Sequence, residues 1–330
     1  MHGIKRQQYS REILKQKRIQ DQQKIKTYKE LTQSALDTRD NGIFTIDALQ
    51  LTSKILELNP EFNTIWNYRR DIILNVTNDV KSDFWENELQ FTMEKLKRFP
   101  KVYWIWNHRI WVLDNYPNAT DKIWLRELFV VDKLLSMDAR NYHGWHYRRL
   151  IVKKLESITG KLMDKEELKY VTTIINKNIS NYSAWHQRVQ LITNIFNKHE
   201  LNKEEMKGMV LSEISYITNA IYTDADDQSV WFYTNWFIAN DIVRLVLTNE
   251  EYIKMLKDIK DNVVLINNDD VEFSGKENNW CLKILIVIEK ALKEAGYELN
   301  EDELTEEYLK KLIENDPQRR NRYIHLSTKQ

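Results

Sequence analysis

Polar and cationic side chains gather at the starts of two neighbouring predicted helices. They are Lys101, Tyr103, Arg140, Tyr142 and His143. The first turn of a helix has unpaired backbone N–H groups and the positive end of the helix dipole, so it favours anions, and nearby cations add to this effect. We interpret the group as half of a phosphate- or carboxylate-binding surface that another chain completes. The alternative is that the tyrosines pack against their neighbours while Lys and Arg are solvated.

The sequence lacks the common motifs of a self-contained active site. Its seven glycines are scattered, so there is no glycine-rich phosphate loop, and no CxxC, HExxH or GxSxG motif occurs. Cys281 follows Trp280 in an apolar stretch, where a buried structural thiol is expected rather than a nucleophile. We therefore expect this chain to contribute residues to a site that it does not complete alone.

Five tryptophans recur at nearly constant spacing and indicate the elements that hold the candidate site. They are Trp66, Trp106, Trp145, Trp185 and Trp231. Their separations are 40, 39, 40 and 46 residues, and apolar residues recur ten positions before and six positions after each of them. A fixed register over this length is typical of a repeat protein.

An arginine follows each of the first four tryptophans at the third position. These residues are Arg69, Arg109, Arg148 and Arg188. The fifth repeat has Thr234 there, and Tyr323, six residues after Pro317, is interpreted as the anchor of a divergent last repeat. Residues three apart share a face of a helix, so the recurring Trp and Arg predict packing around a buried charge network.

Each repeat reads as two helices. Trp124–Met137 has apolar residues at helical spacing, a polar break follows, and a second helix begins near His143. Such a hairpin buries its apolar face only by stacking on its neighbours. We predict an all-α fold, an α-α superhelix of about six stacked antiparallel hairpins forming one repeat domain over residues 45–330.

Two segments lie outside the repeat pattern. Residues 1–44 are predicted to be a basic helical segment packed on the repeat domain or leading into it, with nine Lys and Arg among the first 30 residues. This segment is either a solvated helix or an interaction arm for an acidic partner. Residues 267–279, rich in Asn, Asp and Gly, are predicted to be a loop or hairpin join.

The pair His143 and His146 has the i, i+3 spacing of two ligands for one metal. His146, however, occupies the repeat position after the tryptophan, where other repeats have Asn67, Asn107 and His186. A position that recurs in this way is architectural, so we predict no metal site in this chain.

Composition narrows the class of protein further. Lys and Arg number 49, as do Asp and Glu, so no net charge draws the whole chain to nucleic acid or to an anionic membrane. No apolar run approaches the roughly 20 residues of a membrane span, so no stable membrane insertion is expected. The single cysteine fits a reducing compartment and predicts a cytoplasmic protein.

Four segments carry a resemblance to a known family. They are NPEFNTIWNYRR (59–70), FPKVYWIWNHR (99–109), DARNYHGWHYRR (138–149) and NISNYSAWHQR (178–188). These segments are similar to the repeat of the protein prenyltransferase α-subunit family, and the resemblance covers nearly the whole chain in order. Within the family they look closest to the Rab geranylgeranyltransferase (type II) branch, in its budding-yeast form.

The resemblance implies a crescent-shaped α subunit that forms an obligate heterodimer with a β subunit. The β subunit of the family binds the catalytic zinc and the isoprenoid, and magnesium is a further candidate cofactor. Such a heterodimer transfers geranylgeranyl from geranylgeranyl diphosphate to C-terminal cysteines of a Rab GTPase, a step in vesicle transport. An escort protein docked on the α subunit presents the Rab.

The resemblance also implies roles for single residues. In the family motif PKxYxxW the lysine reaches the substrate diphosphate, and this position is Lys101, with Tyr103 beside it. In the next repeat, the corresponding substrate-binding residues are Asn141, Tyr142 and His143. His2 is a weaker candidate for a ligand to the partner's zinc, and Arg140 receives no role.

Two other functions remain open at this point. The chain resembles, less closely, the α subunit shared by farnesyltransferase and type I geranylgeranyltransferase. It is also compatible with a helical-repeat scaffold that binds proteins without taking part in chemistry. Nucleic-acid binding by the basic N-terminus is disfavoured, because no base-stacking motif accompanies the Lys and Arg residues.

Overall fold

The computed structural model describes residues 11–76, 84–298 and 303–328. In these ranges it contains α-helices and one 3-10 turn and no β-strand, which confirms the all-α fold class. The chain divides into two compact units, Met1–Thr159 and Gly160–Gln330. The division of the sequence at residues 44 and 45 stays a prediction.

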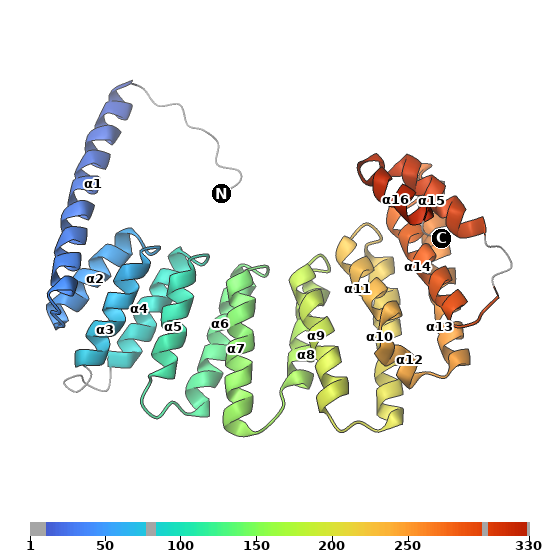
Figure 1. Ribbon diagram of the computed structural model, residues 1–330, viewed down its shortest axis with the longest axis horizontal. Helices are drawn as coiled ribbons and strands as arrows, with labels where there is room; N and C mark the ends of the chain where they lie inside the picture. Colours follow the sequence, from blue (N-terminus) through green and yellow to red (C-terminus); the bar gives the residue numbers. More distant parts are fainter. Residues whose placement is uncertain (1–10, 77–83, 299–302, 329–330) are drawn as a thin grey trace. The chain divides into compact units, whose positions relative to one another are not determined.

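The first unit contains a long helix followed by three antiparallel hairpins (Figure 1). The helices are α1 (Arg11–Asp40), α2 (Ile46–Leu58), α3 (Asn63–Val76), α4 (Phe84–Arg98), α5 (Tyr103–Asp114), α6 (Asp121–Met137) and α7 (Tyr142–Thr159). Helix α1 packs on α2, and its side chains are almost all exposed, with Ala35 the buried one. The second helices α3, α5 and α7 are consecutive neighbours.

The second unit continues the same pattern with four hairpins and one inserted short helix (Figure 1). Its helices are α8 (Asp164–Lys177), α9 (Tyr182–Lys198), α10 (Lys203–Thr223), α11 (Gln228–Ala239), α12 (Asp241–Val246), α13 (Asn249–Ser274), α14 (Asn279–Glu294), α15 (Glu303–Asn315) and α16 (Arg320–Ser327). A 3-10 turn, η2 (Pro317–Arg319), joins the last two helices.

An Asx turn separates the two helices in four of the hairpins. The side-chain oxygen of Asn59, Asp138, Asn178 or Asp224 accepts the backbone N–H two residues later, at 3.1–3.3 Å. Each of these residues directly follows the first helix of its hairpin. Asn and Asp favour this turn because their short side chains mimic a backbone carbonyl. The local sequence therefore fixes where the first helix ends.

The recurring tryptophans anchor the second helices to these turns. The indole Nε1–H donates to the carbonyl six residues earlier in each repeat, at 2.8–3.0 Å. The acceptors are the carbonyls of Pro60, Pro100, Ala139, Ile179 and Ala225. All five rings are buried, so this bond satisfies a polar group that has no access to water.

Buried arginines join one hairpin to the next. Arg109 donates two hydrogen bonds to Glu127 at 2.8 Å and also binds the Leu89 carbonyl and the Thr92 hydroxyl. The Arg69–Glu88 and Arg188–Glu213 pairs repeat this bidentate geometry at 2.6–2.7 Å. The sequence predicts a buried charge network around the arginines, and these contacts confirm it. The glutamate partners were not predicted.

The structure contains one more hairpin than the six or so predicted. Helices α13 and α14 form a pair in which Leu282 takes the helix position of the tryptophan anchors. Leu282 packs in a buried cluster with Leu309, Leu312 and Tyr323. Tyr323 occupies the same position in α16, but its hydroxyl donates to the Asp316 carboxylate instead of a backbone carbonyl. An aliphatic anchor does not stand out in sequence, which explains the missed repeat.

The prediction of a loop over residues 267–279 is wrong for most of that segment. Helix α13 continues to Ser274, and Gly275 ends it in the left-handed conformation, with φ of 70°. The segment stays helical because Asn267 is buried and its side chain accepts the backbone N–H of Asn278. At least one of the polar residues in this segment, Asn267, therefore makes a tertiary contact instead of forming a loop.

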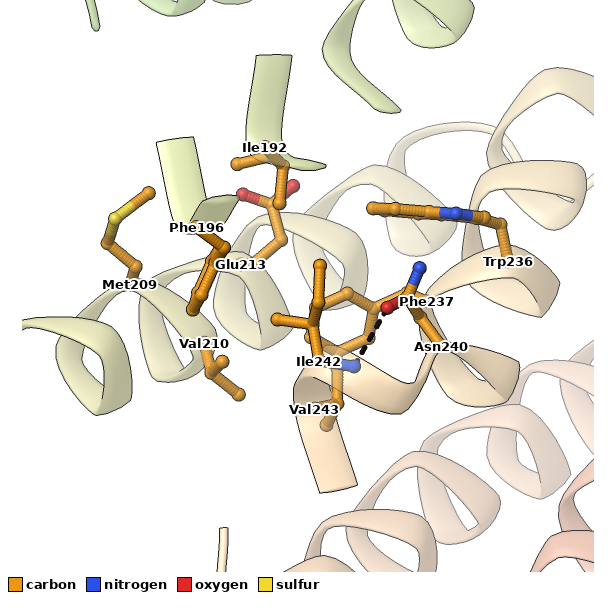
Figure 2. A pocket seen from close by; sticks show the side chains of 10 residues that line it. All are labelled: Ile192, Phe196, Met209, Val210, Glu213, Trp236, Phe237, Asn240, Ile242 and Val243. Carbon is orange, nitrogen blue, oxygen red and sulfur yellow. Dashed lines mark hydrogen bonds between the residues drawn. The ribbon is translucent and has the colours of Figure 1, made fainter. Parts of the chain in front are cut away.

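A small internal cavity lies in the second unit among α9, α10, α11 and α12. Figure 2 shows its mostly apolar lining, with Glu213 and Asn240 as the polar exceptions. Its volume of about 10 Å³ is room for about one water molecule. The Asn240 side chain already accepts the N–H of Ile242 at 2.9 Å. The cavity is therefore a packing defect and is too small to be a ligand site.

Among the described residues, no helix combines the length and apolar character that crossing a membrane requires.

The buried Arg109–Glu127 pair provides a test of how much the stack depends on these arginines. Replacing Arg109 with Met should lower the free energy of unfolding by about 3–5 kcal/mol, because Glu127 would stay buried without its cation. The matched control is Arg126→Met, which removes an exposed ion pair with Glu86 and should cost less than about 1 kcal/mol. Urea unfolding followed by circular dichroism measures both, and equal losses would contradict the prediction.

Candidate functional site

Lys101 lies in the turn between α4 and α5, beside the first turn of α5. Its side chain is 79% exposed, and its ammonium lies 3.8 Å from a carboxylate oxygen of Asp138. The next residue, Val102, is buried, and Phe99 and Pro100 before Lys101 are half-buried. The ammonium group is thus presented to solvent from a fixed backbone.

Asn141 links the turn of Lys101 to the next hairpin. The Asn141 amide donates to the Pro100 carbonyl at 3.1 Å, and its side-chain oxygen accepts the N–H groups of His143 and Gly144. The residue is therefore both the N-cap of α7 and a tie across the two hairpins. With 6% of its surface exposed, Asn141 holds neighbouring residues in place and presents little of its own surface.

His143 packs beside the turn that carries Lys101. Its ring meets Tyr103 edge-on at 4.2 Å between centroids and is stacked on Trp106 at 6.4 Å. Burial, followed by the nearby His146, lowers the pKa of His143, while a hydrogen bond with the backbone of Lys101 opposes the shift. The neutral ring therefore adds a second contact between α7 and the turn of Lys101.

Tyr103 and Tyr142 open α5 and α7 with most of their side chains in solvent. They are 55% and 65% exposed, and both rings contact His143. Each tyrosine thus packs on His143 with one part of its ring and faces solvent with the rest, so both interpretations of this surface stay open. Lys101 and these rings lie on one surface. Such a surface can bind a ligand that has both an anionic group and an apolar group.

Arg140 lies in the same turn as Asn141 and is exposed, with its backbone N–H bound by Asp138. His146 is exposed one turn into α7, and its pKa is lowered by burial and by Arg149 and Lys153. No three His, Cys, Asp or Glu side chains lie together as metal ligands in the described ranges. His2 lies outside the described residues.

Asp138 is the site residue that the motifs did not reveal. The repeat has Asn or Asp at this position in four hairpins, so its type looked purely architectural. Its closeness to Lys101 depends on how one hairpin stacks on the next. In the sequence, the only indication of this contact is that a carboxylate stands at position 138 and a lysine at position 101, one hairpin earlier.

Comparisons with known proteins identify the family of this chain. Residues 46–76, 85–116, 124–155 and 164–195 match the family model described as "Protein prenyltransferase alpha subunit repeat". The chain is 58% identical over 326 residues to the geranylgeranyl transferase type-2 subunit alpha of Saccharomyces cerevisiae, covering 99% of this chain and 98% of that one. This chain belongs to the protein prenyltransferase α-subunit family.

Other relatives locate the chain within the family. The type-2 α subunit of Schizosaccharomyces pombe is 38% identical, covering 100% of this chain and 98% of that protein. The human type-2 α subunit is 33% identical over 244 residues, which are 72% of this chain and 42% of the human one. These relatives are type-2 α subunits, and this similarity favours the type-2 branch over the shared farnesyl and type I subunit.

A solved structure supports the fold. Candida albicans protein geranylgeranyltransferase-I complexed with GGPP matches with a TM-score of 0.67, at 20% identity, over 91% of this chain and 89% of that chain. At this identity the match bears on the fold alone. The fifth hairpin, α10 and α11, lies beyond the four matched repeats but keeps their tryptophan contact through Trp231.

The tie through Asn141 can be tested against an equivalent cap. Asn141→Ala and Asn181→Ala each remove an N-cap and should each cost about 1 kcal/mol of stability. Only Asn141→Ala should also speed amide hydrogen exchange over residues 101–105, because it removes the bond that ties the Pro100 carbonyl to the next hairpin. Exchange measured by mass spectrometry decides this, and equal exchange in both variants would contradict the proposed tie.

Proposed function

We propose that this chain is the α subunit of a heterodimeric Rab geranylgeranyltransferase. The heterodimer transfers geranylgeranyl from geranylgeranyl diphosphate to C-terminal cysteines of a Rab GTPase presented by an escort protein. The 58% identity to a type-2 α subunit supports this class of activity. The proposed role of this chain rests on Lys101, which is exposed beside Tyr103, Tyr142 and His143.

The proposed chemistry needs cations more than it needs a nucleophile from this chain. The carbon–oxygen bond to diphosphate breaks while the cysteine sulfur bonds to the same carbon, and the electron pair of the broken bond stays on the diphosphate. Negative charge grows on this leaving group, and preorganised donors stabilise it. Lys101 supplies one positive charge there, and the first turns of α5 and α7 supply helix-dipole potential.

The remaining residues of the site would position and shape it. Asn141 and His143 hold the backbone that carries Lys101, while Tyr103 and Tyr142 provide aromatic surface next to it. Family members carry a zinc ion in the β subunit, and that ion supplies thiol activation when bound. As the resemblance to the family implies, we propose that the zinc belongs to the β subunit.

Replacing Lys101 with Ala tests this function. Prenyl transfer by the reconstituted heterodimer should fall about ten- to thousandfold, the range for losing one charge-stabilising donor. The loss should be in kcat more than in KM, since the lysine acts mainly on the leaving group in the transition state. Steady-state kinetics with a Rab bound to escort protein measure both constants.

Two controls belong to this experiment. Lys122→Ala, which removes an exposed lysine from α6, should leave the rate unchanged. A short CaaX peptide in place of the escorted Rab should receive no prenyl group. An unchanged rate for Lys101→Ala in an intact heterodimer removes Lys101 from the mechanism, and transfer to the peptide assigns the chain to the shared α subunit.

A surface for the partner subunit is proposed on the second unit. The helix position after the anchor is exposed and polar in the first four hairpins, as Asn67, Asn107, His146 and His186. In the last three hairpins the same position holds Phe232, Lys283 and Ile324. Two of these three residues are apolar, although the surrounding repeat is the same. An apolar residue at an otherwise polar, exposed position supports a contact with another protein there.

A groove of about 600 Å³ runs over this surface between α11, α14 and α16. Phe232 is 60% exposed in it and meets Trp280 edge-on at 5.5 Å between centroids. Lys283 lies over the Trp280 ring at 4.5 Å and pairs with Asp316 at 3.3 Å, and Arg322 adds another cation. An apolar segment with flanking carboxylates on the β subunit fits this lining.

Phe232→Asp should weaken association with the β subunit at least tenfold, because aromatic anchors dominate binding energy at such contacts. The matched control is Phe129→Asp on α6, where the side chain is also 60% exposed but lies outside the groove. Titration of labelled β subunit gives both dissociation constants. Equal effects of the two variants would exclude the groove as the docking surface.

A further inference from the structure

The turn that ends α6 contains a charge that the fold does not need. Asp138 accepts the N–H of Arg140, and Asn59 and Asn178 make the same contact in their own hairpins. A neutral amide therefore suffices for this turn. The turn therefore does not require the negative charge at position 138, which Asp224 shares in the fifth hairpin.

The charge faces Lys101. Oδ2 of Asp138 lies 3.8 Å from Nζ of Lys101, with the two side chains 38% and 79% exposed. Asp138 follows α6 and Lys101 precedes α5, so the contact joins two hairpins. The turn of Lys101 is also fixed from α7 by Asn141 and His143, which leaves the lysine side chain as the movable part.

A lysine side chain has four rotatable bonds and loses much conformational entropy when it binds a ligand. A carboxylate at 3.8 Å restricts that freedom before the ligand arrives. The same carboxylate competes with a bound diphosphate for the ammonium. One group thus both orients Lys101 and opposes tight retention of an anion.

We infer that Asp138 is a positioning residue that holds Lys101 near the leaving-group site and keeps the affinity for released diphosphate low. The inference rests on the proposed function, since it assigns Asp138 to the same anion site. Free diphosphate carries more negative charge than the prenyl ester, so it competes most strongly for Lys101. Asp138 therefore favours departure of the product more than it weakens binding of the substrate.

The test is the isosteric variant Asp138→Asn in the full heterodimer, with inorganic diphosphate as the probe. The inhibition constant of diphosphate should tighten about two- to fivefold, the range for exposed ion pairs, while KM for the prenyl diphosphate changes less. In a Lys101→Met background the same substitution should have no effect, because Asp138 acts through the lysine.

Asp224→Asn is the matched control, since Asp224 makes the same turn in the fifth hairpin. It should leave the inhibition constant unchanged and so show that the amide itself has no effect. No tightening for Asp138→Asn, or equal tightening without Lys101, overturns the inference. A wild-type heterodimer that transfers no prenyl group contradicts the proposed function instead, and the two failures are thereby distinguished.

Discussion

The buried guanidinium–carboxylate pair is the interaction on which the stack of hairpins depends. Arg69 binds Glu88 in the following hairpin and the Leu49 carbonyl and Thr52 hydroxyl in its own first helix. One side chain thus joins three helices. A buried charge is costly unless all its partners are present, so a shifted hairpin would strand both an arginine and a glutamate. The pair therefore favours one spacing between hairpins over all others.

The candidate site is a consequence of that spacing. Once successive hairpins are fixed, the first turns of α5 and α7 lie side by side, and Asn141 can reach the Pro100 carbonyl. Lys101 is then exposed on a backbone that neighbours hold from two directions. A charged group carried on a rigid backbone is the arrangement that an anion-stabilising residue requires.

The same scaffold carries different surfaces along its length. At the position after the anchor, the first four hairpins have polar residues, and the fifth and seventh have Phe232 and Ile324. The backbone and the tryptophan contact do not change with this substitution, since Trp231 keeps its bond to the Ala225 carbonyl. A repeat protein can therefore change what it binds along its length without changing how it folds.

The sequence by itself determined the repeat and the all-α fold, because Trp and Arg recur at a fixed helical register, and it predicted the residues of the candidate site. It did not reveal Glu88, Glu127 and Glu213, because these follow their arginines by 19, 18 and 25 residues and so show no register. It also missed Leu282, an aliphatic anchor.

Only the tertiary structure decided which groups of different hairpins meet. The contact between Asp138 and Lys101 joins residues whose separation of about one repeat says nothing of their distance in space. Stacking fixes that distance, and stacking is set by the buried pairs and by packing of the tryptophans. Local patterns specify each hairpin, whereas the electrostatics of the site arise from how the hairpins pack.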